Sequence, residues 1–289
     1  MPRPHTATGE DASAPRSILI TGCSSGIGLD AAHALAARGW RVLATCRDPA
    51  DCARLGTGGL ESFPLDLASE ASIARAVDEA GTRLGEMPDA LFNNGAFAIP
   101  GAVEDMPRAA FREIFETNLF GQIDLTNRVL PGMRGRGSGR IVMNSSVLGL
   151  VAAPWRGAYV ASKFALEGLT DTLRLELRGS GIAVTLIEPG PIGTPFRAKS
   201  IPRFERHVDW RASPHAARYE SELLPRLYGQ HKRKDRFELP PGAVTAKLIA
   251  ALESPRPAAR YTVTHRARAA AALRRLLPTG WLDRVLAGR

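Results

Sequence analysis

Ser17-Ile18-Leu19-Ile20-Thr21-Gly22-Cys23-Ser24-Ser25-Gly26-Ile27-Gly28 is the stretch of this chain that decides its fold. An apolar run leads into a glycine-rich turn, and an amphipathic segment ending at Gly39 follows. This order predicts a strand, a tight turn and a helix. Such a turn suits a pyrophosphate, because glycines let backbone N–H groups approach the anion and the helix N-terminus adds positive partial charge. A Gly/Ser turn without any ligand is the alternative.

Each glycine of the turn has an expected task. Gly22 allows the sharp turn, Gly26 allows backbone N–H groups to reach an anion, and Gly28 allows the helix to pack close to the strand. Ser24 and Ser25 add hydroxyl donors in the same loop. The turn therefore favours nucleotide binding.

Strands and helices alternate along most of the chain, which predicts an α/β fold: a single doubly wound Rossmann-type domain, with a parallel seven-stranded sheet and helices on both faces. The expected strands are 17–21, 41–46, 60–65, 89–93, 139–145, 182–188 and 260–264, and the expected helices are 26–38, 69–84, 108–133, 157–179 and 242–253. Segment 191–241 breaks this rhythm after a strand end, where ligands bind in such sheets, so we expect a lid-like insertion over the substrate. A mobile surface excursion is the alternative. The expected domains are a disordered leader over 1–15, the Rossmann-type catalytic domain over 16–265, and a basic amphipathic helical segment over 266–289.

Composition limits the class of protein. The chain has 289 residues, 44% of them hydrophobic, which is enough for one sizeable core. It has no run of 18 or more apolar residues, so we expect no transmembrane segment, and no apolar signal segment opens it. Three cysteines in no common zinc pattern predict neither a disulfide framework nor a metal site, and favour a cytoplasmic protein.

The net charge of +9 raises the question of an anionic partner. The densest basic run is 231–236, but aromatic residues do not interleave with basic ones as in RNA-binding proteins, so we expect a solvated basic surface and no nucleic acid. Segment 266–289 combines arginines with an apolar face. Peripheral contact with a membrane is one alternative for it, and packing on the body or on a second subunit is favoured.

Polar residues follow three expected strands at the edge where ligands bind. Arg47 comes after strand 41–46, and a basic residue there suits a 2′-phosphate, whereas an acidic one suits a ribose 2′-hydroxyl. Asp48 follows at once, but Arg47 favours NADP(H) over NAD(H). Asp66 is placed to contact an adenine edge, and Asn93-Asn94-Gly95 forms a turn that lets backbone approach a ribose. Each of these residues has a turn role as its alternative.

Tyr159 and Lys163 lie four residues apart, on one face of an expected helix. A free tyrosine has a pKa of about 10, and a nearby positive charge lowers it, so the pair indicates a proton donor and acceptor with its own activator. Ser146 ends a strand thirteen residues earlier and suits a hydrogen bond to a substrate carbonyl; Ser145 is the competing candidate. Asn118 interrupts a long helical segment, which indicates a bound water or a kink.

These motifs together resemble the short-chain dehydrogenase/reductase family over roughly residues 16–265. The glycine turn, Tyr159-Val160-Ala161-Ser162-Lys163 and the run Glu188–Thr194 carry the resemblance, which is closest to the hydroxysteroid/retinol dehydrogenase branch and to bacterial NADP-dependent aldehyde reductases. It implies a catalytic set of Asn118, Ser146, Tyr159 and Lys163. It also implies cofactor contacts from Gly22, Ser24, Ser25, Gly26, Ile27, Gly28, Arg47, Asp66, Leu67, Asn94, Gly95, Tyr159, Lys163, Pro189, Gly190, Ile192 and Thr194.

The resemblance implies an NADP(H)-dependent enzyme that interconverts a carbonyl and an alcohol by hydride transfer. Tyr159 is then the general acid and base, Lys163 lowers its pKa and holds the nicotinamide ribose, Ser146 polarises the carbonyl, and Asn118 anchors a water. An apolar small-molecule substrate and a homo-oligomer are expected. A hydroxysteroid- or retinol-specific dehydrogenase and a non-catalytic NAD(P)-binding sensor or regulator are the alternatives.

One departure from the family pattern concerns the turn after strand 89–93. The order here is Asn93-Asn94-Gly95-Ala96, where the family has Asn-Asn-Ala-Gly. If the last position required a positive φ, Ala96 would be strained.

Overall fold

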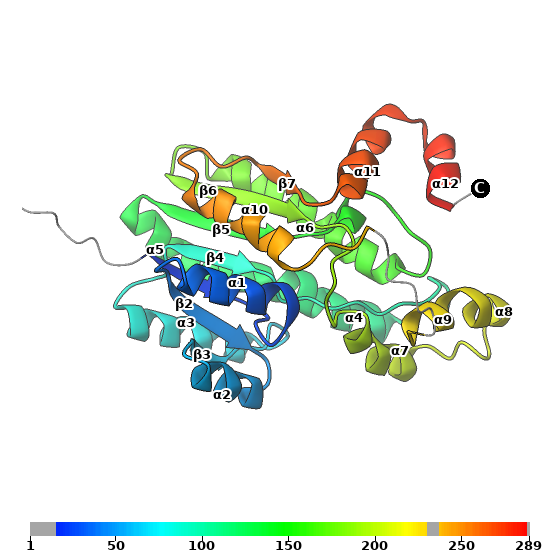
Figure 1. The fold of residues 1–289 in the computed structure, drawn as a ribbon, viewed down its shortest axis with the longest axis horizontal. Coiled ribbons are helices and arrows are strands. Elements are labelled where there is room, and N and C mark those ends of the chain that lie inside the picture. Colours follow the sequence, from blue (N-terminus) through cyan, green and yellow to red (C-terminus); the bar gives the residue numbers. More distant parts are fainter. Residues whose placement is uncertain (1–15, 230–236, 288–289) are drawn as a thin grey trace, which may run out of the picture.

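A computed structural model describes residues 16–229 and 237–287 of the chain. The predicted leader over 1–15 and the basic run 231–236 lie outside the described residues. A seven-stranded, all-parallel sheet crosses the molecule in the order β3-β2-β1-β4-β5-β6-β7 (Figure 1). The strands are β1 (Ser17–Ile20), β2 (Arg41–Cys46), β3 (Glu61–Pro64), β4 (Ala90–Asn93), β5 (Gly139–Asn144), β6 (Ile182–Glu188) and β7 (Arg260–Thr262). The predicted fold class is confirmed, and all seven expected strands are present within two residues of their predicted ends.

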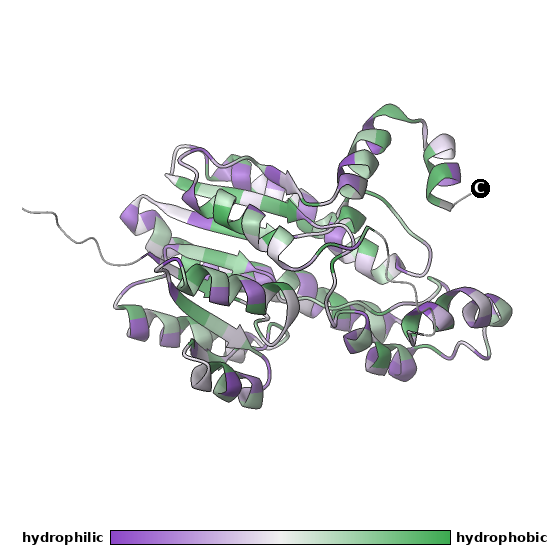
Figure 2. Ribbon diagram, in the orientation of Figure 1, coloured by the Kyte–Doolittle hydropathy of each residue, from purple (hydrophilic) through white to green (hydrophobic). Residues whose placement is uncertain are grey.

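Helices cover both faces of the sheet because strand residues alternate between two cores. Ile18 and Ile20 pack with α1, α2 and α10 on one face, while Leu19 packs with α3, α5 and α6 on the other. Figure 2 shows the apolar residues running through the central strands. The helices of the main body are α1 (Gly26–Ala36), α2 (Pro49–Thr57), α3 (Glu70–Leu84), α4 (Arg108–Phe115), α5 (Gly121–Arg136), α6 (Gly157–Glu176) and α10 (Gly242–Glu253).

The strand order reverses between β1 and β4, and this reversal locates the functional edge. The chain runs from β1 out to β3 and then returns to the other side of β1. Crossovers therefore leave the sheet in opposite directions at the carboxyl ends of β1 and β4, which opens a crevice there. The glycine turn follows β1 and Asn94-Gly95 follows β4, so both predicted cofactor segments meet at this point.

Two predictions of helices were wrong in detail. The expected helix 108–133 is divided by a π-helical turn over Glu116–Phe120, so α4 and α5 are separate, and α5 runs on to Arg136. Asn118, where the sequence indicated a bound water or a kink, lies in this π-helical turn. Helix α2 was not predicted, because it is short and buries only Cys52 and Leu55, which leaves too small an apolar face for a clear helical period.

The described part of segment 191–241 contains short helices that pack on the body. It contains α7 (Ile201–His207), α8 (Ala216–Arg218) and α9 (Leu224–Leu227). Phe204 and Tyr219 are buried in a third apolar cluster, shared with α4 and the start of α6. The Tyr219 hydroxyl donates to Asp105 Oδ2 at 2.7 Å and accepts from Ala102 N at 2.8 Å.

The C-terminal part forms α11 (His265–Leu276) and α12 (Thr279–Ala287), which project from the body beyond β7 (Figure 1). Large apolar side chains there are exposed: Leu276, Trp281 and Val285. Within residues 16–229 and 237–287, none of the helices has both the length and the apolar character to cross a bilayer.

A glycine contact between α5 and the chain after β3 gives a test of this packing. A Cβ at Gly121 would lie 1.8 Å from the carbonyl oxygen of Leu67, whereas a Cβ at Gly135, in the same helix, would meet nothing within 4 Å. We expect Gly121→Ala to lower the free energy of unfolding by about 1–3 kcal/mol, because backbone must move. Gly135→Ala should raise it by up to about 1 kcal/mol. Urea denaturation of both variants checks this, and equal effects would contradict the packing described.

Candidate active site

The glycine turn after β1 is held by close backbone contacts. Gly22 has φ 73°, a conformation that favours glycine, and a Cβ on Gly28 would lie 2.4 Å from the Gly22 carbonyl oxygen. The Asn94 amide donates to the carbonyls of Thr21 at 2.9 Å and Gly22 at 3.4 Å, which ties the turn to the end of β4. The turn therefore has the shape predicted for it, with the N-terminus of α1 opening onto the sheet edge.

The turn after β4 carries no strain at Ala96. Trp155 is the one non-glycine residue with a positive φ among residues 16–229 and 237–287, so Ala96 does not require the conformation that its family position suggested. The Thr21 hydroxyl accepts from Gly95 N at 2.8 Å, and Gln122 Nε2 donates to the Gly95 carbonyl at 2.9 Å. The reversed Gly-Ala order is thus accommodated by an ordinary backbone.

Tyr159, Lys163 and Ser146 come together at this edge. Both α6 residues are buried, at 8% and 1% exposed, and Lys163 Nζ lies 5.8 Å from the centre of the Tyr159 ring. Ser146 follows β5, its Oγ accepts from Leu148 N at 3.1 Å, and its hydroxyl acts on the Tyr159 phenol to lower its pKa. Ser145, the competing candidate, has its hydroxyl under the Val147–Gly149 turn near Glu167, so the geometry favours Ser146.

The pKa of Tyr159 moves opposite to the predicted direction. Burial raises it to about 12, because the phenolate loses solvation, and a hydrogen bond with Ser146 and the charge of Arg156 only partly oppose this. The cation that opposes the effect of burial here is Arg156, and the lowering of this pKa by Lys163 stays a prediction. Tyr159 is protonated at neutral pH and can act as an acid.

Lys163 is buried with few partners. Its ammonium donates to the Asn144 carbonyl at 2.8 Å. Burial lowers the pKa of Lys163 to about 8, and the charge of Glu167, one helical turn further on, opposes this. The ammonium is thus charged at neutral pH but close to its midpoint.

Asn118 is fully buried and its side chain is occupied by protein. Its Nδ2 donates to the Phe97 carbonyl at 2.8 Å and to Ser162 Oγ at 3.2 Å, and its Oδ1 accepts from Phe97 N at 3.0 Å. These bonds join the π-helical turn to the chain after β4 and to α6. The water-anchoring role of Asn118 stays a prediction.

The residues predicted to bind the adenosine end line the ends of β2 and β3. Arg47 is exposed, and Asp48 is used as the N-cap of α2, accepting from Ala50 N at 2.9 Å. Asp66 accepts from Ala68 N at 3.0 Å, and Leu67 is buried beside Gly95.

The segment after β6 closes the other side of the edge. A Cβ on Gly190 would lie 2.1 Å from the hydroxyl of Thr264, and Ile192 pairs with Leu239. Thr194 lies against the glycine turn, where a Cβ on Gly26 would be 3.0 Å from its methyl group. Pro189 accepts from Val147 N at 2.8 Å and so fixes the Ser146 turn.

A family model for short chain dehydrogenases matches residues 16–203. The chain belongs to the short-chain dehydrogenase/reductase family. It is an oxidoreductase of the NAD(P)-dependent type that acts on CH–OH and C=O groups.

Known proteins similar to this dehydrogenase cover most of its length. The uncharacterized oxidoreductase YbbO of Escherichia coli (strain K12) is 43% identical over 273 residues, 94% of each chain. Retinol dehydrogenase 8 of Bos taurus is 34% identical over 94% of this chain and 88% of its own. Human 17-beta-hydroxysteroid dehydrogenase type 1 is 34% identical over 86% and 77%.

Solved structures agree with the fold. A short-chain dehydrogenase from Streptomyces avermitilis is 27% identical, with a TM-score of 0.73 over 96% of this chain and 95% of that one. A short-chain dehydrogenase/reductase from Burkholderia phymatum, in complex with NAD, has a TM-score of 0.78 at 24% identity over 95% of each chain, and shows the fold alone.

Three residues near the dehydrogenase site were not predicted. Lys199 donates to Ser24 Oγ at 3.0 Å and Ser25 Oγ at 2.7 Å, and the Phe196 ring lies 5.6 Å from the Tyr159 ring. Arg156 lies within electrostatic reach of the phenol. Lys199 and Phe196 are far from these partners in sequence, so only the fold reveals them. Arg156, three residues before Tyr159, was open to prediction as a neighbouring charge.

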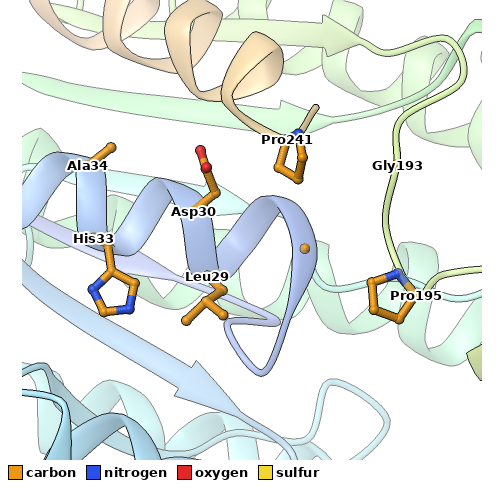
Figure 3. Close-up of a pocket in the computed structure, with 8 residues that line it drawn as sticks. Leu29, Asp30, His33, Ala34, Gly193, Pro195 and Pro241 are labelled. Carbon is orange, nitrogen blue, oxygen red and sulfur yellow. The ribbon is translucent and has the colours of Figure 1, made fainter. Parts of the chain in front are cut away.

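An open groove of about 640 Å³ lies beside the glycine turn but away from Tyr159. It is lined by residues of α1, among them Leu29, Asp30 and His33, and by Pro195 and Pro241; Asp30 points toward Pro241, whereas Leu29 and His33 project from the other side of the helix (Figure 3). Of the predicted site residues only Gly26 lines it, so it is not the reaction site. Residues 16–229 and 237–287 also contain no cluster of three or more His, Cys, Asp or Glu side chains suited to a metal ion.

A group of ion pairs joins α6, β6 and β7 next to the site. Arg260 on β7 contacts Glu167 at 3.1 Å and Asp171 at 2.6 Å, both on α6, and its Nε lies 3.0 Å from Glu188 Oε1 at the end of β6. One guanidinium thus joins the Tyr159–Lys163 helix to the strand that precedes Pro189. Burial, followed by repulsion from Glu167, raises the pKa of Glu188 to about 7.

This raised pKa makes stability depend on pH. Because Glu188 binds its proton more tightly in the folded protein, its contribution is complete below the unfolded pKa, near 4.5, and is lost as the pH rises to about 7. We expect Glu188→Gln to gain stability relative to the parent between pH 5 and pH 8, by at most ~3 kcal/mol. Chemical denaturation at both pH values measures the difference, and Glu176→Gln, an exposed change on α6, is the control. Parallel behaviour of both variants would refute the assignment.

Proposed function

We propose that this protein is an NADP(H)-dependent oxidoreductase that interconverts an aldehyde or ketone and an alcohol, with Tyr159 as general acid and base. The observation that carries the proposal is the meeting of Ser146, Tyr159 and Lys163 with the glycine turn at one sheet edge. A non-catalytic sensor would need the turn but not Ser146, Tyr159 and Lys163 buried beside it.

The residues present fit a dinucleotide. The cradle at Gly22 and Gly28 leaves no room for a Cβ, and the N-terminus of α1 beside it favours an anion. Lys199 also supports this fit, because among the residues that the structure describes its ammonium donates to the neutral hydroxyls of Ser24 and Ser25 and forms no ion pair. The bound nicotinamide supplies the hydride chemistry.

The protein's own groups handle the proton and the carbonyl. Tyr159, protonated at neutral pH, donates its proton to the carbonyl oxygen in reduction and removes it from the alcohol in oxidation. Ser146 positions the same oxygen. Lys163 holds the nicotinamide ribose hydroxyls, and the Phe196 ring shields Tyr159 from solvent as part of a lid over 191–241.

Two features favour NADP(H) over NAD(H). The carboxylate nearest the tip of β2, Asp48, is engaged in capping α2 and so is poorly placed for a ribose 2′-hydroxyl. Arg47 adds positive charge at the end of β2, and Lys199 adds it beside the glycine turn.

The names of two relatives indicate a second candidate for the substrate class. Retinol dehydrogenase 8 and 17-beta-hydroxysteroid dehydrogenase type 1 make a retinol- or steroid-specific activity the second candidate. A cytoplasmic location fits three free, buried cysteines, and a homo-oligomer remains a prediction.

The catalytic assignment has a direct test. We expect Tyr159→Phe to lower turnover at least about a thousandfold while NADPH still binds, because the ring remains and only the proton donor is lost. NADPH consumption with aldehydes, ketones, retinal and a ketosteroid, together with NADPH fluorescence titration, checks this. Near-normal turnover in this variant would remove Tyr159 from the mechanism.

The cofactor assignment rests on charge. We expect Arg47→Asp to shift the NADPH/NADH preference toward NADH by roughly tenfold or more, because a phosphate contact becomes a repulsion. Lys199→Gln should weaken binding of NADPH by a smaller factor. Dissociation constants of both cofactors measure this, and an unchanged ratio in Arg47→Asp would show that another residue reads the 2′-position.

A further inference from the structure

Large apolar side chains are exposed on the last two helices of the chain. Leu276 of α11 is 77% exposed, and Trp281 and Val285 of α12 are 61% and 55% exposed. Trp281 and Val285 are four residues apart and therefore lie on one face of α12. Both helices project from the body beyond β7 (Figure 1), and the other described parts of the chain leave these three side chains uncovered.

Arginines accompany these apolar side chains, with little acidic charge to offset them. Residues 265–287 contain five arginines and one acidic residue, Asp283. Arg268, Arg275 and Arg284 are exposed, and none of them forms a salt bridge with a carboxylate in the part of the chain that the structure describes. The Arg284 guanidinium lies 5.5 Å from the centre of the Trp281 ring. Unpaired cations beside exposed apolar side chains are typical of helices that lie on a membrane surface.

Helix α11 is attached to the body beside the catalytic turn. Its first turn is capped by the Thr264 hydroxyl, which accepts from Ala267 N at 3.1 Å, and Ala267 is fully buried. Further on, Arg274 Nη1 donates to the Leu150 carbonyl, and its guanidinium lies 4.6 Å from the centre of the Phe164 ring. Leu150 directly follows the Val147–Gly149 turn that begins after Ser146. Arg274 therefore has a structural role, and the exposed apolar residues come after this attachment.

The expected cofactor does not account for the exposed arginines. The residues predicted to hold its adenosine end follow β2 and β3, and the glycine turn follows β1. Helix α11 follows β7, which is the opposite edge of the sheet. Arg268, Arg275 and Arg284 therefore belong to the other side of the molecule from the predicted phosphate contacts.

A second copy of this chain does not suit the same surface. In a two-fold symmetric contact each surface meets itself, so the three exposed arginines of one copy would approach those of the other. Like charges repel at short distance, and Asp283 is the one acidic residue of the segment. The whole chain also carries a net charge of +9. The complementary partner is therefore an anionic molecule of another kind, with an apolar region for Trp281.

We propose that α11 and α12 form a docking surface for a lipid bilayer with anionic headgroups. Leu276, Trp281 and Val285 enter the boundary between headgroups and acyl chains, and the exposed arginines bind the headgroups. A tryptophan suits this boundary because its ring is apolar and its N–H is polar. The attachment of α11 next to the Ser146 turn brings the catalytic edge of the sheet close to the bilayer. The inference does not depend on the proposed reaction.

Vesicle binding by the full chain tests the proposal. We would sediment the protein with vesicles of phosphatidylcholine alone, and with vesicles of equal parts phosphatidylcholine and phosphatidylserine. We expect binding to the anionic vesicles to be tighter by roughly tenfold or more, and to weaken as salt increases. Equal affinity for both kinds of vesicle, or no binding to the anionic ones, would overturn the proposal.

Apolar substitutions assign the binding to this surface. We expect Trp281→Gln and Leu276→Gln each to weaken binding to anionic vesicles by about fivefold or more, because less apolar surface leaves water. Leu175→Gln is the matched control, since Leu175 on α6 is 61% exposed, as Trp281 is, and should leave binding unchanged. All three positions are exposed, so folding should be unaffected. Binding that survives both C-terminal substitutions would belong to another part of this basic chain and would refute the assignment.

Charge substitutions test the second part of the surface. Arg275→Gln and Arg284→Gln should each weaken binding to anionic vesicles severalfold at low salt, since each arginine near an anionic surface adds about a fivefold factor. Arg178→Gln removes an exposed arginine that follows α6 and should have no such effect. If all three variants bind alike, the C-terminal arginines do not contact the headgroups and the proposal fails.

Two further measurements separate the bilayer from a second copy of the chain. Tryptophan fluorescence of the parent should shift to shorter wavelength when anionic vesicles are added, and Trp281→Phe, which keeps an apolar ring, should lose this shift. Sedimentation velocity without vesicles should give the same mass for the parent and Trp281→Gln. An oligomer that Trp281→Gln dissociates would show that α12 is a subunit interface, and would overturn the bilayer as its partner.

Discussion

The close approach of backbone between the turn after β1 and the end of β4 is the constraint on which the rest of this dehydrogenase depends. At Gly28, α1 lies so close to the Gly22 carbonyl that a Cβ would not fit. The Asn94 amide donates hydrogen bonds to the carbonyls of Thr21 and Gly22. Because β1 and β4 flank the reversal of strand order, this contact sets the width of the crevice. Asn144 extends the same line by donating to Asn94 at 2.9 Å, while its carbonyl receives the Lys163 ammonium. The cofactor turn and the catalytic helix are therefore connected through two asparagines.

At the site, burial affects the pKa values of the ionisable side chains more than ion pairing does. Burial favours the neutral forms, so it raises the pKa of Tyr159 and Glu188 and lowers that of Lys163. Arg260 offsets part of this by holding Glu167, Asp171 and Glu188 behind the site. Arg156 forms no ion pair among the residues that the structure describes, and burial lowers the pKa of its guanidinium.

Much of the fold and most of the candidate site could be predicted, because they depend on short-range patterns. The seven strands follow from apolar runs with flanking turn residues, and Gly22 and Gly28 follow from their position between strand and helix. The missed features depend on contacts distant in sequence. The π-helical turn at Asn118 is stabilised by Phe97 and Ser162, and the helices of 191–241 are stabilised by burying Phe204 and Tyr219 against α4 and α6. Neither leaves a periodic signal, since tertiary packing overrides weak local preference.

By itself the sequence determined where the strands lie along the chain, where the glycine turn lies, and that Tyr159 and Lys163 share one helix face. These features depend on residue spacing and side-chain period, which act locally. Only the tertiary structure decided which charges act on the phenol. Helical spacing brings Lys163 near the Tyr159 ring, but the burial of both groups depends on what the rest of the chain places around them. Electrostatic energies depend on distance and burial in space, and neither quantity is contained in sequence separation.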